Sequence, residues 1–161
     1  MAKIIFDTSP LQYLYQLGLI DLIPKLMKQI VVPQAVVDEL AQGRRIGVAV
    51  PDPLKLEWVT VERVDHAHLL LLAWDLGPGE REALALALQE AEGLVILDDG
   101  LARLAAKTLQ IPHMGTLGIL LRAKQEMLLP AVAPFLDRLQ ALGFFLNAET
   151  HHTVLKLANE L

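Results

Sequence analysis

The hydrophobic residues of this chain occur in short segments of two kinds. Some are runs of three to six residues between polar ones, such as 4–6, 30–32 and 94–97, which have the length of buried strands. Others recur at the spacing of helices. The two kinds alternate from one end of the chain to the other, with no repeat and no linker rich in glycine or serine. We therefore predict a single α/β domain over residues 1–161, in which helices connect the strands of a parallel sheet that is covered on both faces.

Prolines, glycines and small polar residues indicate where these elements begin and end. We expect strands over residues 3–6, 30–32, 58–61, 94–97 and 111–114. We expect a helix capped by Ser9 with Pro10 at its first position, and further helices over 22–28, 33–41, 80–92, 101–109, 115–127, 131–142 and 149–157. Gly43 is expected to end the third helix. Residues 44–55 are read as a loop or broken helix, 77–79 as a turn, and 69–74 as either a helix or a strand.

Composition argues against a membrane protein. Hydrophobic residues make up 53% of the chain, yet the longest uninterrupted apolar stretches, such as 69–74 and 83–88, are far shorter than the ~18 residues of a membrane span. The first strand follows the amino terminus almost at once, so no signal peptide is expected. The absence of cysteine excludes thiol chemistry and suits the reducing cytoplasm, where we expect the protein to act.

The charge of the chain limits how it can bind nucleic acid. A formal net charge of -5 argues against coating nucleic acid by bulk electrostatics. Local basic pairs remain, namely Arg44 with Arg45, and Arg103 with Lys107 one helical turn later. Each pair is a candidate for contacting phosphates, although such pairs more often form a solvated helix face.

Two acidic groups follow predicted strands. Asp7 comes directly after strand 3–6, and Asp98 and Asp99 come after strand 94–97. Open α/β sheets build their sites at the carboxyl ends of parallel strands. Asp7 alone would also suit a helix cap. The adjacent pair Asp98 and Asp99 favours a functional role, because neighbouring carboxylates repel each other unless a cation or hydrogen-bond donors lie between them.

Two further acidic groups lie in predicted helices. Asp38 and Glu39 belong to a helix that buries Val36, Val37 and Leu40, so only one of the two carboxylates is expected to face the sheet, and we favour Glu39. Glu80 and Glu82 precede the wholly apolar stretch 83–88, and anionic residues in a first turn also interact favourably with the helix dipole.

Carboxylates from all four groups would suit divalent-metal hydrolysis of a phosphodiester. Mg²⁺ and Mn²⁺ prefer hard oxygen ligands and are held by a few carboxylates with several waters. The hydroxyls of Thr8 and Ser9 would orient a carboxylate, a water or a phosphate. Thr116, between Gly115 and Gly118, is either a phosphate-binding residue or a plain helix cap. The five histidines lack the pairing of zinc hydrolases and are interpreted as structural: His66, His68, His113, His151 and His152.

The order of these motifs resembles the PIN-domain family. The residues that carry the resemblance are Ile4-Ile5-Phe6-Asp7-Thr8-Ser9, Val36-Val37-Asp38-Glu39-Leu40, Gly79-Glu80-Arg81-Glu82-Ala83-Leu84, Val95-Ile96-Leu97-Asp98-Asp99 and Gly115-Thr116-Leu117-Gly118. The resemblance implies a Rossmann-like three-layer α/β/α sandwich with a parallel sheet of about five strands. It also implies a Mg²⁺- or Mn²⁺-dependent endoribonuclease that cleaves single-stranded RNA, forms a homodimer and in many prokaryotic members is the toxin of a toxin–antitoxin pair.

Carried over to this chain, the resemblance assigns the metal ligands to Asp7, Glu39, Glu82 and Asp99, with Asp98 as a further ligand. Thr8, Ser9, Glu80 and Thr116 are expected to support them, and Arg44, Arg45, Arg103 and Lys107 to contact nucleic acid. The family often has aspartate at the third position, where this chain offers Glu80 or Glu82; Glu82 is favoured because it directly precedes Ala83 and Leu84. Asp99 fits the family's last position slightly better than Asp98, and both choices remain open. Two alternatives also remain: a catalytically degenerate module that binds RNA or protein, and a protein that works only through dimerisation or antitoxin binding.

Overall fold

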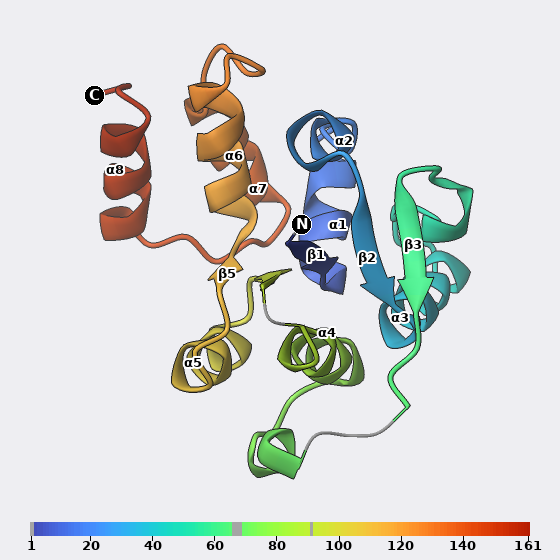
Figure 1. The fold of residues 1–161 in the computed structure, drawn as a ribbon. Helices are drawn as coiled ribbons and strands as arrows, with labels where there is room; N and C mark the ends of the chain where they lie inside the picture. Colours follow the sequence, from blue (N-terminus) through green and yellow to red (C-terminus); the bar gives the residue numbers. More distant parts are fainter. Residues whose placement is uncertain (1, 66–68, 91) are drawn as a thin grey trace.

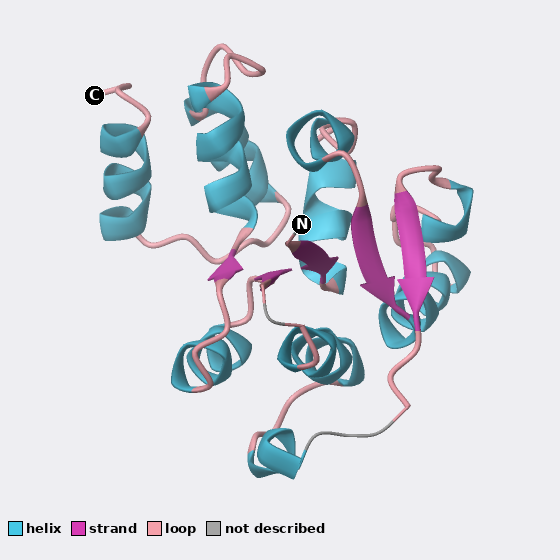
Figure 2. Cartoon of the chain, viewed as in Figure 1, coloured by secondary structure: helices cyan, strands magenta, loops and turns pink. Residues whose placement is uncertain are grey.

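A five-stranded parallel sheet forms the centre of the computed structural model, which describes residues 2–65, 69–90 and 92–161 (Figures 1 and 2). The strands are β1 (Lys3–Phe6), β2 (Ile30–Pro33), β3 (Val59–Glu62), β4 (Gly93–Ile96) and β5 (His113–Met114). Their order across the sheet is β3-β2-β1-β4-β5. All four neighbouring pairs are parallel, which confirms the predicted sheet, although β5 is shorter than expected.

Helices connect the strands and continue the chain beyond β5. They are α1 (Thr8–Gln16), α2 (Leu22–Met27), α3 (Gln34–Arg45), α4 (Pro78–Leu88), α5 (Gly100–Thr108), α6 (Thr116–Gln125), α7 (Ala133–Ala141) and α8 (Ala148–Leu157), with short 3-10 helices η1 (Pro53–Lys55) and η2 (Leu69–Ala73). In the described part of the chain, none of these helices has the length and apolarity that crossing a membrane requires.

Two hydrophobic cores lie on opposite faces of the sheet. Because successive residues of a strand point to opposite faces, Phe6 and Ile96 join the core formed with α1, α2, α3 and α6–α8, whereas Ile5 and Val95 join the core formed with α4 and α5. All four of these side chains are fully buried. The result is the three-layer α/β/α sandwich that the sequence predicted (Figure 1).

Several predicted helix boundaries were wrong, among them the end of α4, which lies at Leu88 and not at residue 92. Helix α1 begins at Thr8 with Asp7 in the N-cap position, so Ser9 is not the cap. Helix α4 begins at Pro78, two residues before the predicted start, because proline fits the first turn, where a backbone N–H has no partner within the helix. Helix α3 continues through Gly43 to Arg45, with Val48 and Val50 packed beside that glycine.

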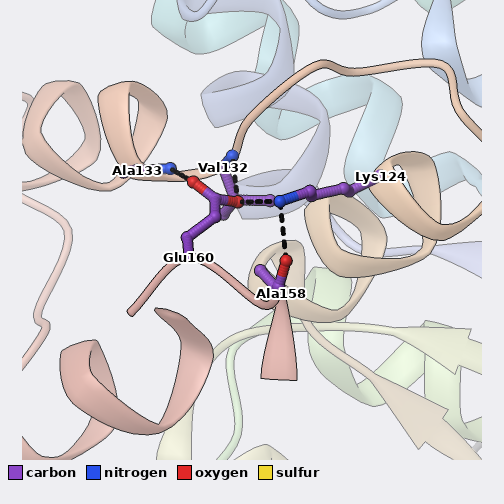
Figure 3. Close-up of polar contacts among 5 residues, drawn as sticks. All are labelled: Lys124, Val132, Ala133, Ala158 and Glu160. Atoms are coloured by element: carbon purple, nitrogen blue, oxygen red, sulfur yellow. Dashed lines mark hydrogen bonds and ion pairs between the residues drawn. The ribbon is translucent and has the colours of Figure 1, made fainter. Parts of the chain in front are cut away.

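The carboxyl-terminal segment is fastened to the rest of the chain by one ion-paired cluster (Figure 3). The Glu160 carboxylate accepts hydrogen bonds from the backbone N–H groups of Val132 and Ala133, at 2.8 and 3.0 Å, and from Lys124 Nζ at 2.9 Å. Lys124 Nζ also donates to the carbonyl of Ala158 at 2.6 Å. These contacts join α6, the start of α7 and the end of the chain, so that α8 is held against α6.

Candidate functional site

The acidic residues meet where the order of the strands reverses. β1 and β4 are neighbours in register, with Phe6 opposite Ile96, while β2 and β5 lie outside them. The Asp7 N–H donates to the carbonyl of Ile96 at 2.9 Å, so Asp7 and Asp98 leave the sheet side by side. Such a switch point leaves a crevice at the carboxyl ends of the strands, where open α/β sheets bind ligands.

Asp7 is the most buried carboxylate of the site, with only 3% of its surface exposed. Although it occupies the N-cap position of α1, its side chain makes no capping hydrogen bond. The pKa of Asp7 is raised to about 7, mainly by burial; the negative charges of Glu80, Glu39 and Asp98 add to the rise, and a hydrogen bond from the Thr8 backbone opposes it. Three other acids therefore surround a carboxylate whose ionised form is strongly disfavoured by burial.

Glu39 reaches the same place from α3. Its carboxylate accepts a hydrogen bond from the hydroxyl of Thr8 at 2.7 Å, which fixes it beside the start of α1. The neighbouring Asp38 is exposed and accepts a hydrogen bond from Gln34 on its own helix. Of this acidic pair, Glu39 is therefore the member that faces Asp7.

The two glutamates of α4 face different neighbours. Glu80 accepts a hydrogen bond from the backbone N–H of Gly77 at 3.1 Å. Burial raises the pKa of Glu80, and the charges of Asp99 and Glu39 add to that effect. Glu82 instead accepts a hydrogen bond from the Ala35 N–H at 2.9 Å, at the start of α3. The geometry thus brings Glu80 to the other acids and gives Glu82, the residue favoured from the sequence, a separate contact between two helices.

Asp98 and Asp99 are both engaged with helix starts. Asp98 accepts two hydrogen bonds from Thr116, one from its N–H at 2.8 Å and one from its hydroxyl at 2.7 Å. Burial raises the pKa of Asp98, while the bonds from Thr116 and the charge of Arg103 oppose that rise. Asp99 is exposed and caps α5 by accepting from the Ala102 N–H at 3.0 Å. The Thr116 N–H therefore already has a partner. Of the two sequence-based interpretations, phosphate binding by Thr116 required this N–H to be free.

The basic residues predicted to contact nucleic acid differ in their surroundings. Arg44 donates to the carbonyl of Pro51 at 2.9 Å and lies 3.9 Å from Asp52, so its guanidinium is held in the loop after α3. Arg45 is exposed and donates to Gln42 within α3. Arg103 and Lys107 are exposed on α5, and Arg103 lies beside Asp98.

The remaining candidates lie outside this cluster of interactions. Ser9 is a half-buried residue of the first turn of α1. Nδ1 of His113 lies 3.0 Å from the carbonyl of Ile111, and His151 lies 3.8 Å from Asp137. His66 and His68 fall outside the described residues.

The site offers donors of the right chemistry for a hard metal ion, although their side chains are spread around the crevice. Over the described ranges, no three side chains of His, Asp or Glu form a group that would hold a metal as they stand. The donors are nevertheless carboxylate oxygens, as Mg²⁺ and Mn²⁺ require, and Asp7 and Glu39 flank a common point beside Gly79. A cation there would offset the mutual repulsion that raises the pKa of Asp7.

Sequence reasoning missed the importance of Gly79, which it assigned to a turn. Gly79 lies in the first turn of α4, and a Cβ atom on it would clash with Oε1 of Glu39 and lie 3.1 Å from Oδ1 of Asp7. The signal that would have found it is a glycine directly after a proline at a helix start, since glycine within a helix costs about 1 kcal/mol relative to alanine and usually has a packing reason.

Comparison with known proteins gives one match. A family model described as a PIN domain matches residues 3–160, which is nearly the whole chain. No curated protein and no solved structure gives a significant match.

Proposed function

The chain belongs to the PIN-domain family, and from this premise we propose that it is a cytoplasmic metal-dependent endoribonuclease that cleaves single-stranded RNA. PIN domains are generally nucleases, so the family supports a nuclease-type fold. The observation that carries the finer proposal is Asp7, a carboxylate buried at the switch point of the sheet with Glu39, Glu80 and Asp98 around it.

We assign the metal ligands to Asp7 and Glu39, with Glu80, Asp98 and Asp99 available at the rim. Glu80 replaces Glu82 in this assignment because the charge of Glu80 acts on Asp7, whereas Glu82 lies between α3 and α4 with its carboxylate on the Ala35 N–H. When bound, Mg²⁺ or Mn²⁺ would supply a Lewis acid that activates water and offsets the charge on the leaving oxygen.

The other side chains hold these acids in place. Thr8 fixes Glu39 through its hydroxyl, and Thr116 fixes Asp98 through both its hydroxyl and its N–H. Arg103, exposed beside Asp98, is positioned to contact a phosphate of the RNA, and Lys107 lies one turn further along α5. Loss of a hydrogen bond that holds a metal-binding carboxylate, such as those from Thr8 and Thr116, typically changes metal affinity by about 10–100-fold.

The test is cleavage of a fluorescently labelled single-stranded RNA in the presence of Mn²⁺ or Mg²⁺. The wild-type chain should cleave it, excess chelator should stop cleavage, and Asp7→Asn and Glu39→Gln should be inactive. Asp38→Asn is the matched control, since it removes the exposed acid next to Glu39 on the same helix. Cleavage by Asp7→Asn, or cleavage that survives chelation, would contradict the proposal.

The principal alternative is a non-catalytic module that binds RNA or protein. The observation that favours this alternative is that no three acids in the described part of the chain lie close enough together to hold a metal as they stand. Calorimetric titration with Mn²⁺ separates the two, because a degenerate site would show no carboxylate-dependent binding at millimolar metal.

We further propose that the protein is a homodimer and the toxin of a toxin–antitoxin pair. Large apolar side chains are exposed in the single chain, including Phe145 at 87% and Met127 at 90%. A second copy of the chain or an antitoxin would cover such side chains. Light scattering of the protein alone tests the homodimer, and light scattering with the product of the neighbouring reading frame tests whether that product binds as an antitoxin would.

A further inference from the structure

Helices α3 and α4 pack against each other (Figure 1), and two of the contacts between them lie one helical turn apart. At one contact, Glu82 of α4 accepts the hydrogen bond from the Ala35 N–H of α3. At the other, Gly79 of α4 faces the carboxylate of Glu39 of α3. Residues 35 and 39 lie on one face of α3, and residues 79 and 82 lie on one face of α4, so both contacts belong to the same interface.

The contact with Ala35 fastens the two helices together. Ala35 is the second residue of α3, where backbone N–H groups have no partner within the helix, and Pro33 in the N-cap position has no side-chain donor or acceptor to offer. Glu82 therefore caps α3 from the neighbouring helix. With α4 held there, the backbone one turn earlier lies directly against Glu39.

The contact at Gly79 leaves no room for a side chain. A Cβ atom at this position would clash with Oε1 of Glu39 and lie 3.1 Å from Oδ1 of Asp7. Gly79 has no positive φ angle, so alanine would suit its backbone. Space for the two carboxylates is thus the reason for glycine at this position.

We propose that Gly79 and Glu82 are positioning residues for Glu39: Glu82 sets the distance between the helices, and Gly79 leaves the gap in which Glu39 approaches Asp7. This inference rests on the proposed function in taking Glu39 as a metal ligand. It also separates two roles for Glu82, since a positioning residue needs only an acceptor for the Ala35 N–H, whereas a metal ligand needs a carboxylate.

Calorimetric titration of the full chain with Mn²⁺ distinguishes these roles. Glu82→Gln keeps an acceptor oxygen and should bind Mn²⁺ as wild type does, whereas Glu82→Ala and Gly79→Ala should weaken binding by about tenfold or more. Gly43→Ala is the control, because a Cβ on this glycine of α3 meets its nearest neighbour at an ordinary 3.7 Å. Equal losses in Glu82→Gln and Glu82→Ala, or unchanged binding in Gly79→Ala, would overturn the proposal.

Crystal structures of the metal-free variants test the positioning of Glu39 independently of the proposed function. If the wild-type chain binds no Mn²⁺, the proposed function fails, and Glu39 in Gly79→Ala then decides the inference. Displacement of its carboxylate from the Thr8 hydroxyl supports positioning by Gly79, and an unchanged hydrogen bond refutes it. If Gly79→Ala does not fold, the same change is made together with Glu39→Ala: recovery of folding supports the inference, and continued failure overturns it.

Discussion

Replacing Asp7 by asparagine should stabilise the metal-free protein while destroying its site. Asparagine has nearly the same shape as aspartate but carries no charge. It removes the cost of ionising a carboxyl group that is only 3% exposed and is surrounded by other acids. A residue that lowers stability in this way is expected where a charge is kept for function rather than for folding.

The size and sign of the effect follow from the pKa of Asp7. Its pKa rises from 3.8 to about 7 on folding, and each pKa unit corresponds to about 1.4 kcal/mol, so the upper limit is about 4 kcal/mol. Between these two values the folded chain keeps the Asp7 proton that the unfolded chain has lost, so the free energy of unfolding falls as pH rises. Above about pH 7 both states have lost the proton and the effect is constant. The advantage of Asp7→Asn should therefore grow by about 3 kcal/mol between pH 5 and pH 8.

Urea unfolding in excess chelator at pH 5, 6, 7 and 8 measures this difference. Asp38→Asn is the control, because removing an exposed surface charge changes the free energy of unfolding by at most about 0.5 kcal/mol. Adding Mn²⁺ should reverse the order at neutral pH by stabilising only the wild-type chain. A difference between Asp7→Asn and wild type that stays constant with pH, or that shrinks as pH rises, would refute the reasoning.

Three further predictions test the surroundings of the site. Thr8→Val removes the hydrogen bond to Glu39 and should lower Mn²⁺ affinity by about tenfold by calorimetry without unfolding the chain; unchanged affinity would mean that the hydroxyl does not position Glu39. Arg103→Ala should reduce the slope of log affinity for single-stranded RNA against log salt by about 0.7, whereas Arg44→Ala, whose guanidinium is held by Pro51 and Asp52, should not; a slope in Arg103→Ala equal to that of wild type would exclude the phosphate contact. Glu160→Gln should lower the free energy of unfolding by about 1 kcal/mol at pH 7. Burial opposes the ionised form of Glu160, but its bonds from Lys124 and two N–H groups outweigh that and lower its pKa below the ordinary 4.5. The loss should therefore start to shrink as pH falls below about 4.5 and vanish once pH has fallen through the lowered pKa, and a loss that does not shrink with falling pH would contradict the reasoning.

Local sequence patterns predicted the strands and the acids that follow them. β1 and β4 are short apolar runs; Asp7 follows β1 directly and Asp98 follows β4 after Leu97, so their placement at one edge follows from parallel pairing alone. Glu39 likewise follows from helical spacing, because its neighbours Val36 and Leu40 are buried and define the inner side of α3.

The rotation of α4 could not be predicted in the same way. Glu80 and Glu82 lie two residues apart, about 200° around the helix axis, so only one of them can face the other acids. Residues 83–87 are all buried, and a helix that is apolar on every side gives no stripe from which to read its orientation. Packing against α3 decides it, through Glu82 on Ala35 and Gly79 against Glu39.

The sequence by itself therefore determined the family, the parallel sheet and the acids at its strand ends, because these depend on residues close together in the chain. Tertiary structure alone decided which hydrogen-bonding groups are already taken. Thr116 is bonded to Asp98, Arg44 to Pro51 and Glu82 to Ala35. Each of these bonds joins residues whose meeting depends on the path of the folded backbone, and such a meeting leaves no local pattern in the sequence.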